Sequence, residues 1–461
     1  MKKILYILLL TSLISCNFWK NTNSNTYFGG EIVNPKSKFV LLIKDEVVLD
    51  SITLDKSNRF LGTYESFEEG LYTFKHGNEF QYIYLEPKDS VLVRLNTWDF
   101  DESLVFSGKG SHKNEFLLNI FLQNEKEEIG MFQNFHLNES EFEYKIDSLS
   151  EVRDRIYKEF ANSERNISNG FEKLTQTALR YPLYRLKEIY PYYNKIANGL
   201  DRFPTISEDF YKFRKKINFN EENLVSFYPY QNYIVSYLYN IGYQQKEQDS
   251  SKSNLTSNIL IETSKHIELE SFKNNLLKRI IINDFLKSET TCKINEKALD
   301  IFLQNCTDDI YITQVKNLVN DSKVVENNKP LTNFKISTYN NIESSINELI
   351  KNKKTVIYFW STEFMSSEYL TKRIKFLETA HPTILFIGIN MKTKNNNFEI
   401  DRNFKILDIT KQYRLPSNSA AHSFLTSNYP RTIMVQKNGI VLNGFTYLDS
   451  KKFNAELLKL E

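Results

Sequence analysis

The sequence has few of the residues from which metal, redox and nucleophilic sites are built. Its 461 residues include three cysteines and six histidines. The histidines lie in separate segments, without His-x-x-x-His spacing or a neighbouring cysteine, so a metal site is not supported. No Gly-x-Ser-x-Gly elbow and no Walker segment occurs, and Gly108-x-Gly110 lacks the third glycine of a dinucleotide-binding loop. We therefore expect neither a metal nor a cofactor.

An excess of one charge is also missing. The chain has 59 Lys and Arg beside 57 Asp and Glu, a formal net charge of +2. Lys2 and Lys3 lie in an N-terminal segment that we expect to be removed, which leaves 57 basic residues. A balanced chain gives no overall electrostatic reason to bind nucleic acid or anionic lipid.

Long apolar runs are absent as well, and the most apolar segment lies at the N-terminus. Lys2 and Lys3 precede an apolar run over residues 4–14 that a tyrosine, a threonine and a serine interrupt. The run is shorter than the roughly 20 residues that cross a bilayer. A short apolar run behind two lysines is typical of a secretory signal.

The signal segment ends in Leu13-Ile14-Ser15-Cys16, which resembles the lipobox of bacterial lipoproteins. The resemblance implies a signal peptide over residues 1–16, a lipid on Cys16 and a polar tether over residues 17–26. Asn17 instead of an aspartate follows the cysteine, and no acidic patch comes next. The same resemblance then favours a lipid-anchored protein of the cell envelope, on the outer membrane and facing the periplasm. The alternative is an ordinary signal with an accidental cysteine.

The other two cysteines, Cys292 and Cys306, are poorly placed to form a disulfide. Apolar residues after Asn295 recur at helical spacing, and Asn295 is a good helix cap. A helix between the cysteines would hold their Cα atoms roughly 20 Å apart, whereas a disulfide tolerates at most about 7 Å. We interpret both as buried, small, apolar residues. The alternative is a displaced redox pair.

The pattern of the mature chain predicts a multidomain α+β protein with three domains. Residues 27–110 contain five or more short apolar runs separated by turn residues and no helical segment, which predicts a β-sandwich. From residue 111 to about 326 the apolar residues change to helical spacing, which predicts an all-α domain of eight to ten helices. Asn138 and Glu141 form a capping box for one helix. The aromatic-rich segments 181–193 and 227–243 are interpreted as core between helices, with a ligand groove as the alternative.

Residues 330–461 predict a third domain with α/β order. A strand at 334–337 and a crossover at 342–351 come before a central strand at 355–359, a helix at 364–379 and a buried strand at 383–390. Further helix is expected within 411–428. Lys437-Asn438-Gly439 then predicts a hairpin between strands at 432–435 and 440–445, and residues 449–460 a closing helix.

This order, with two local motifs, resembles a thioredoxin-like domain of the TlpA/ResA envelope type. Trp360 and the segment to Ser367 follow the central strand, and Pro430 comes before a later one. In the family, a Trp-x-x-x-Cys-x-x-Cys segment opens a helix, and a cis-proline packs against the two cysteines. Phe364 and Ser367 stand at the two cysteine positions, so the resemblance implies a degenerate redox site without thiols.

The other residues of this degenerate site have both structural and functional interpretations. We expect Met365 to pack, and Ser366 and Ser367 to cap the helix, with an anion or peptide site as the alternative. The resemblance implies a cis peptide bond at Pro430. Residues 69–72, 84–89 and 106–110 are similar to an uncharacterised domain that precedes TlpA-type domains in envelope lipoproteins.

Three functions are compatible with these observations, and no catalytic residue is expected in the first. It is a redox-inactive thioredoxin-like domain that binds a polypeptide at the Pro430 loop or serves in assembly, with the membrane contacted through the lipid. The second is a TlpA-type thiol-disulfide oxidoreductase using Cys292 or Cys306. The third is a ligand-binding lipoprotein of an uptake system.

Overall fold

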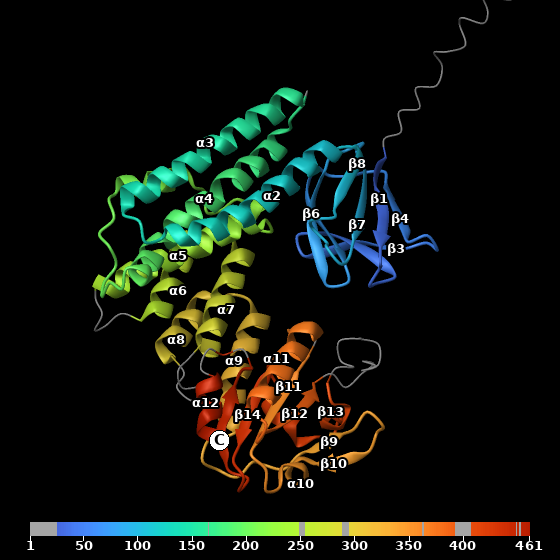
Figure 1. Cartoon of the computed structure of the whole chain (residues 1–461), viewed down its shortest axis with the longest axis vertical. Helices are drawn as coiled ribbons and strands as arrows, with labels where there is room; N and C mark the ends of the chain where they lie inside the picture. Colours follow the sequence, from blue (N-terminus) through green and yellow to red (C-terminus); the bar gives the residue numbers. More distant parts are fainter. Residues whose placement is uncertain are drawn as a thin grey trace, which may run out of the picture. The chain divides into compact units, whose positions relative to one another are not determined.

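The computed structural model describes residues 25–164, 166–248, 254–287, 295–361, 364–391, 407–448, 450 and 453–461. The chain divides into two compact units, the first ending at Asn240 and the second beginning at Ile241 (Figure 1). The predicted signal peptide, Cys16, most of the tether and Cys292 lie outside the described residues. Within the ranges described, no helix is long and apolar enough to cross a membrane.

The first unit begins with a β-sandwich, as the sequence predicted. Two four-stranded sheets have the orders β4-β1-β7-β8 and β3-β2-β5-β6. Alternate residues of the strands point inward, as on β7, and build a shared apolar core around Phe28, Phe74 and Val93. The strands are β1 (Thr26–Val33), β2 (Phe39–Lys44), β3 (Val47–Thr53), β4 (Arg59–Tyr64), β5 (Gly70–His76), β6 (Glu79–Leu85), β7 (Ser90–Asn96) and β8 (Val105–Lys109).

Helices complete the first unit. They are α2 (Ser111–Met131), α3 (Glu139–Ser163), α4 (Asn169–Ala197) and the first part of α5 (Tyr228–Gln248), with 3-10 turns at Phe132–Asn134, Asp209–Lys216 and Glu222–Leu224. The predicted capping box is present, because Asn138 Oδ1 accepts from Glu141 N–H and the Glu141 carboxylate accepts from Asn138 N–H. Tyr190, Tyr230 and Tyr233 are fully buried. The aromatic segments therefore form core, as predicted.

Helix α4 contains two prolines, and side chains from other helices compensate for one of them. Pro182 has no N–H to donate to Ala178 O, four residues before it. Asn124 of α2 donates to that carbonyl at 3.2 Å instead, and Arg153 of α3 donates to Leu179 O at 2.5 Å. Both side chains are buried. The proline in α4 is thus tied to the packing of α2 and α3.

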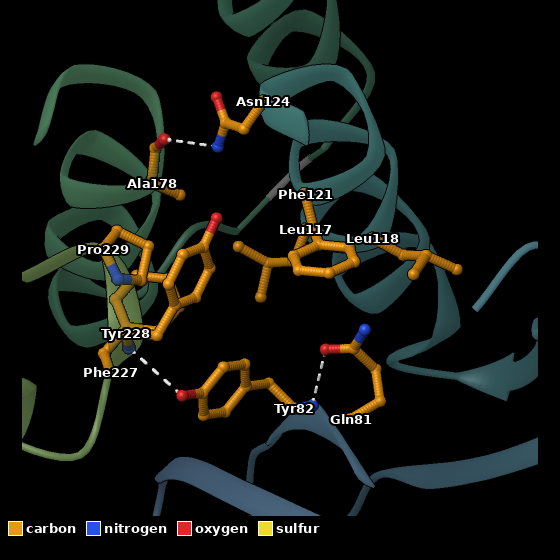
Figure 2. Close-up of a pocket in the computed structure, with 10 residues that line it drawn as sticks. All are labelled: Gln81, Tyr82, Leu117, Leu118, Phe121, Asn124, Ala178, Phe227, Tyr228 and Pro229. Carbon is orange, nitrogen blue, oxygen red and sulfur yellow. Dashed lines mark hydrogen bonds between the residues drawn. The ribbon is translucent and has the colours of Figure 1, made fainter. Parts of the chain in front are cut away.

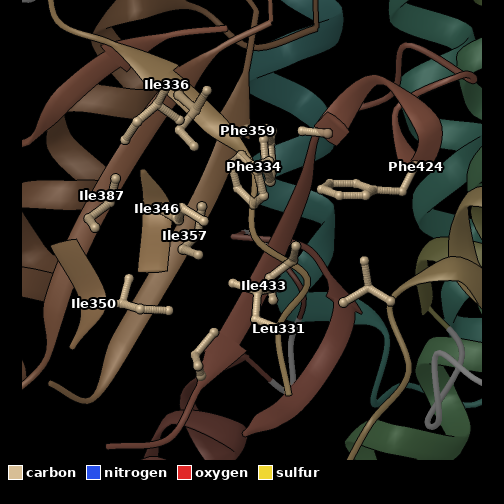
Figure 3. Close-up of a cluster of buried hydrophobic side chains, with 14 of the residues drawn as sticks. Leu331, Phe334, Ile336, Ile346, Ile350, Ile357, Phe359, Ile387, Phe424 and Ile433 are labelled. Carbon is tan, nitrogen blue, oxygen red and sulfur yellow. The ribbon is translucent and has the colours of Figure 1, made fainter. Parts of the chain in front are cut away.

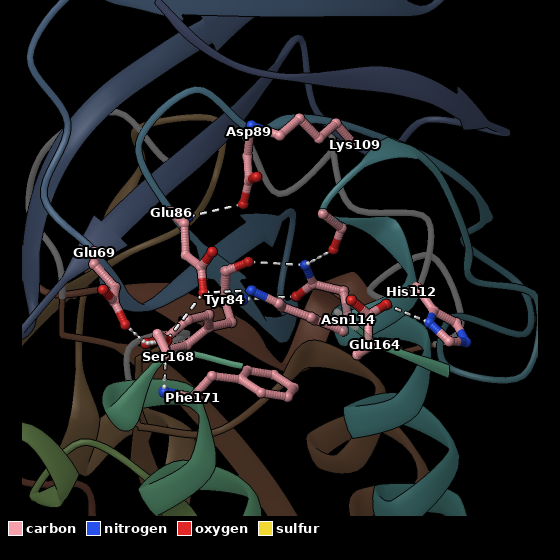
Figure 4. A network of polar contacts seen from close by, with 12 residues as sticks. Glu69, Tyr84, Glu86, Asp89, Lys109, His112, Asn114, Glu164, Ser168 and Phe171 are labelled. Carbon is pink, nitrogen blue, oxygen red and sulfur yellow. Dashed lines mark hydrogen bonds and ion pairs between the residues drawn. The ribbon is translucent and has the colours of Figure 1, made fainter. Parts of the chain in front are cut away.

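The turn between β6 and β7 holds the beginnings of two helices (Figure 4). Asn114 of α2 accepts a hydrogen bond from Tyr84 N–H at 2.6 Å and donates to Tyr84 O at 2.8 Å. The Glu86 carboxylate accepts from Lys113 at 2.5 Å and from Ser168 at 3.0 Å, and Ser168 is the N-cap of α4. We call Tyr84, Glu86, Lys113, Asn114 and Ser168 the Asn114 junction.

Besides the end of α5, four helices of the described second unit come before its sheet. They are α6 (Leu255–His266), α7 (Glu270–Lys287), α8 (Glu296–Asn305) and α9 (Asp309–Val324). Asn295 caps α8 as predicted, since its side chain accepts from Ala298 N–H at 3.2 Å. Cys306 is the C-cap of this helix and its thiol is free.

The sheet of the second unit has seven strands in the order β10-β9-β13-β12-β11-β14-β15. The strands β11, β12 and β13 are parallel. Strand β14 is antiparallel to β11, and β15 is antiparallel to β14. The elements are β9 (Lys335–Ser337), β10 (Glu343–Ser345), α10 (Ile346–Ile350), β11 (Thr355–Trp360), α11 (Ser367–Ala380), β12 (Leu385–Asn390), β13 (Gln412–Arg414), β14 (Arg431–Val435), β15 (Val441–Thr446) and α12 (Phe453–Leu460).

Both faces of this sheet are covered, and alternate residues of β11 serve two cores. Ile357 and Phe359 join a cluster with Phe334, Ile346 and Phe424 (Figure 3). Val356, Tyr358 and Trp360 point to the other face, where α11 and α12 pack. A central parallel β-α-β unit followed by a β-hairpin and a helix is the thioredoxin-like fold. The predicted fold class is confirmed for the β-sandwich, the helical middle and this α/β end.

Two local predictions in this unit are wrong. The helix expected within 411–428 is instead strand β13, which pairs with β12, followed by a 3-10 turn at Ala420–Phe424. Gln412 and Tyr413 are buried beside β12, and Pro416 prevents a continuous helix from forming across the segment. The other error concerns the Pro430 peptide bond.

Candidate functional site

The degenerate redox segment lies where the thioredoxin-like topology places it. Strand β11 ends at Trp360, which is 3% exposed, and Ser361 O accepts hydrogen bonds from Phe364 N–H and Met365 N–H, each at 3.2 Å. Met365 is half-buried against the core cluster that also contains Trp360. Backbone hydrogen bonds therefore link Ser361, just after the central strand, to two residues that precede helix α11.

The first turn of α11 uses its serines structurally. Ser366 is the N-cap, and its hydroxyl accepts from Tyr369 N–H at 3.2 Å. Ser367 begins the helix and is 4% exposed. The predicted capping role is confirmed for Ser366, whose hydroxyl satisfies a backbone N–H that a bound anion would otherwise use.

Phe364 and the Pro430 loop meet at this end of the sheet. The ring of Phe364 lies 5.2 Å from that of Tyr429, centroid to centroid, and 46% of Phe364 is exposed. Burial raises the pKa of Tyr429, so its hydroxyl stays protonated at neutral pH. The position of the first family cysteine thus holds a half-exposed aromatic ring against the residue before Pro430.

The peptide bond before Pro430 is trans, because no cis bond occurs among the residues described. The predicted cis-proline is therefore wrong. The reversal of the chain comes from Asn428, whose φ is 60°, in the left-handed region that asparagine tolerates better than most residues. Asn428 N–H also donates to Leu425 O at 3.1 Å, which closes the turn.

Asp321 at the end of α9 fixes the loop that leads to Pro430. One carboxylate oxygen accepts from the N–H and hydroxyl of Thr426, at 3.0 and 2.7 Å. The other accepts from the N–H and hydroxyl of Ser427, at 2.8 and 2.6 Å. The side chain of Asn317, also on α9, donates to Thr426 O. Helix α9 therefore belongs to the framework of this site.

Arg431 fixes the other side of the same loop. It is 2% exposed and donates to Asp321 O at 2.9 Å, to Phe424 O at 2.7 Å and to Gly444 O. Burial lowers the pKa of Arg431 to about 10, which leaves it protonated at neutral pH. We call Asp321, Thr426, Ser427 and Arg431 the Asp321 clamp. Sequence reasoning missed it, since Asp321 and Arg431 are separated by 110 residues.

The chemistry that these residues can perform is limited. Neither a phenyl ring at Phe364 nor a hydroxyl at Ser367 can form a disulfide. Burial raises the pKa of the Cys306 thiol, which disfavours the reactive thiolate. Within the described ranges, no group of three or more potential metal-binding side chains is found.

Two hollows occur among the described residues, one in each unit. In the first unit, a cavity of about 20 Å³ is enclosed by aromatic and aliphatic side chains, among them Tyr82, Phe121 and Tyr228 (Figure 2). Its volume suits about one water molecule. In the second unit, an open hollow of about 770 Å³ lies at the start of β12, with Lys353, Lys354, Lys411 and Lys437 among its lining residues.

Comparisons with known proteins concern the thioredoxin-like part. No protein-family model matches the chain, and no curated protein matches its sequence. A protein assigned as a thiol-disulfide oxidoreductase from Bacteroides vulgatus is 16% identical over 30% of this chain and 99% of its own, with a TM-score of 0.26. The thioredoxin domain of another from Bacteroides vulgatus is 14% identical over 30% and 99%, with a TM-score of 0.22.

A secreted disulfide oxidoreductase from Mycobacterium tuberculosis is 13% identical over 27% of this chain and 95% of its own, with a TM-score of 0.21. Such low scores decide nothing about activity. The assignment of a thioredoxin-like fold rests on the strand order of β9 to β15 and on the helices that cover both faces of the sheet.

Proposed function

We propose that this protein is a lipid-anchored envelope protein whose thioredoxin-like domain binds a polypeptide without redox chemistry. The observation that carries the proposal is Phe364, which stands at the position of the first family cysteine and packs on Tyr429. The framework around the site is intact, and the thiols that would exchange electrons are replaced. Such a site can still bind a polypeptide, but it cannot catalyse thiol-disulfide exchange.

The contact surface consists of two aromatic side chains, the exposed Phe364 and the half-buried Tyr429. Phe364 and Tyr429 offer apolar rings, and Met365 adds a flexible thioether beside them. The Asp321 clamp orders the Pro430 loop before any partner arrives, so binding costs little loop entropy. A chain segment with an aromatic or aliphatic side chain fits such a surface.

The location of the protein follows from its N-terminal sequence. A lipid on Cys16 would hold the domain at a membrane, and Asn17 favours the outer membrane with the protein facing the periplasm. Modification of Cys16 is tested by mass spectrometry of the protein extracted from membranes. An unmodified Cys16 would remove the anchor from the proposal and leave the binding site standing.

Photo-crosslinking tests the binding site directly. A benzophenone amino acid at Phe364 should capture a polypeptide in the native envelope. The matched control is Phe376, a phenylalanine on α11, the helix that follows Phe364, and it is 56% exposed. Equal capture at both positions, or none at Phe364, would contradict the proposal.

An insulin-reduction assay tests whether the protein lacks thiol-disulfide exchange activity. The purified chain should not reduce insulin, and Cys292→Ala with Cys306→Ala should leave that result unchanged. Turnover that the double variant abolishes would establish the oxidoreductase alternative. Turnover that survives it would also contradict the proposal, because Cys16 is then the remaining cysteine of the chain.

A further inference from the structure

The outer face of sheet β4-β1-β7-β8 has an unusual composition for a solvent-exposed sheet face. Because alternate residues point inward, the register defines which side chains share the outer face. Leu61, Gly29, Leu92 and Ser107 are partners in one row across the four strands. Arg59, Glu31, Arg94 and Val105 form the next row.

The apolar side chains of this face are accessible and adjacent. Leu61 is 58% exposed, Leu92 40% and Val105 54%. Gly29 lies between the two leucines. A Cβ at this position would be only 2.8 Å from Leu61 Cδ1, so the side chain of Leu61 packs over the backbone of Gly29. The two leucines and Val105 therefore form one contiguous apolar strip.

Basic side chains flank this strip. Arg59, Arg94 and Lys109 are exposed on the same face, whose register positions include one carboxylate, Glu31. Glu31 Oε atoms are 3.7 Å from Arg59 Nε and 3.9 Å from Arg94 Nε, so this carboxylate is shared between two guanidinium groups. The whole chain is nearly neutral, but this face has an excess of positive charge.

The short length of chain between Cys16 and the sheet limits how far this face can lie from a membrane-bound lipid. Eight residues lie between Cys16 and Asn25, where the described chain starts, and the nine steps from Cys16 to Asn25 span at most about 32 Å even when fully extended. Strand β1 follows directly and is a central strand of this sheet. A lipid on Cys16 would therefore keep the face within reach of the bilayer surface at a high effective concentration.

We propose that this face, built on Leu61, Leu92, Val105, Arg59, Arg94 and Lys109, docks on an anionic phospholipid surface. The inference rests on the lipid anchor of the proposed function. Guanidinium groups bind phosphate through paired hydrogen bonds, and the leucines and Val105 enter the boundary between headgroups and acyl chains. A second copy fits less well, because pairing this face with itself brings like charges together.

Quenching by brominated lipid tests the docking. The lipidated full chain is reconstituted in vesicles of phosphatidylethanolamine and phosphatidylglycerol, and tryptophan emission is compared between Leu92→Trp and the wild type. The matched control is Phe80→Trp, on the outer face of the other sheet, where Phe80 is 54% exposed. We expect quenching beyond the wild type in Leu92→Trp and none in Phe80→Trp. Ser107→Trp, in the same row, replaces Leu92→Trp if that variant fails to fold.

Charge variants and salt test the electrostatic part. Arg59→Glu and Arg94→Glu in the Leu92→Trp background should each weaken the docked population by at least about fivefold, the effect of one basic residue at an anionic surface. Salt near 1 M, which shortens the Debye length from about 10 Å to about 3 Å, should reduce the quenching similarly. Quenching that persists in phosphatidylcholine vesicles would overturn the charge argument.

The anchor and the docking fail in distinguishable ways. If Cys16 has no lipid, the chain does not stay with the vesicles and the proposed anchor is wrong. If Cys16 is lipidated but Leu92→Trp is quenched no more than Phe80→Trp, the anchor stands and the docking face is wrong.

Discussion

Two polar networks hold a turn against a helix in this protein, one in each unit, and they leave different surfaces behind. In the Asn114 junction, Asn114 bonds to the backbone of Tyr84 near the end of β6, and Lys113 and Ser168 bond to Glu86 in the turn that follows. In the Asp321 clamp, the carboxylate holds the backbone of Thr426 and Ser427, two residues before Tyr429. The clamp therefore orders the loop through its backbone and hydroxyl groups and leaves the ring of Tyr429 free of these hydrogen bonds.

The difference separates a structural role from a binding role. The junction fixes the beginnings of α2 and α4 on the sandwich, and the polar groups of its residues bond to one another. The clamp places Tyr429 beside Phe364, which is 46% exposed. Substitutions in both networks should destabilise their units, whereas only the aromatic pair should affect binding without affecting stability.

The largest effect is expected from Asp321→Ala. The substitution removes four hydrogen bonds to Thr426 and Ser427, and it removes the negative charge that favours the protonated form of the buried Arg431. Breaking one partner of a buried charged network costs about 3–5 kcal/mol in free energy of unfolding. Urea unfolding of the full chain, monitored by a probe in the second unit, measures the loss in free energy of unfolding.

The control for this prediction is Asp309→Ala on the same helix. Asp309 lies in the first turn of α9 and is exposed, so its loss should change the free energy of unfolding little. Equal destabilisation by both variants would show that α9 as a whole, and not the clamp, was disturbed.

A smaller loss is expected from Asn114→Ala in the first unit. The variant leaves the N–H and the carbonyl of Tyr84 without their side-chain partner in a buried place. We expect a loss of about 2–3 kcal/mol, because each unsatisfied buried polar group costs roughly 1–3 kcal/mol. Asn114→Asp sharpens the comparison, since it keeps the acceptor for Tyr84 N–H and loses only the donor.

These two networks also show what could be predicted from the sequence. Contacts between residues close in the chain were readable, such as the Asn138–Glu141 capping box, the Asn295 cap and the Asn438-Gly439 hairpin. Each of these features depends on interactions among residues that are neighbours in the sequence. The placement of Phe364 beside the Pro430 loop also followed, since strand order within the fold fixes it.

The rest depends on partners far apart in the chain. Nothing near Asp321 marks it as a ligand for a loop that lies 105 residues later. Residues 411–428 carried apolar residues at spacings compatible with a helix, but pairing of Gln412–Arg414 with β12 outweighed that local preference. The trans bond at Pro430 was missed because Asn428 supplies the turn that a cis bond would have made.

Phe364→Ala tests binding apart from stability. The side chain is half-exposed, so we expect a change in the free energy of unfolding within about 0.5 kcal/mol, as for most surface substitutions. Capture of a partner by a crosslinker placed at Met365 should fall strongly. Phe376→Ala, on the helix α11 that follows, should lower neither quantity, and a loss of capture there would argue against a site at Phe364.

The smallest effect concerns a second buried aspartate, Asp89, and appears only as a function of pH. Its carboxylate accepts a hydrogen bond from Glu86 N–H at 2.9 Å, whereas Asp321 accepts four. Burial raises the pKa of Asp89 and the charge of Glu86 adds to the shift, whereas the hydrogen bond from Glu86 N–H and the charges of Lys109 and Lys113 oppose it. The folded state therefore binds a proton more tightly than the unfolded state does.

The sign of the pH dependence follows from that difference. The stabilisation that Asp89 contributes is present below its unfolded pKa, about 3.9, and is lost as pH rises through the folded pKa. Asp89→Asn keeps the uncharged form at every pH, so the free energy of unfolding of the variant should improve relative to wild type as pH rises above about 4. Urea unfolding from pH 3 to pH 7 measures this. A difference that is flat with pH would mean that solvent or Lys113 already compensates the charge of Asp89, and the contrast with Asp321 would then lie in hydrogen bonds alone.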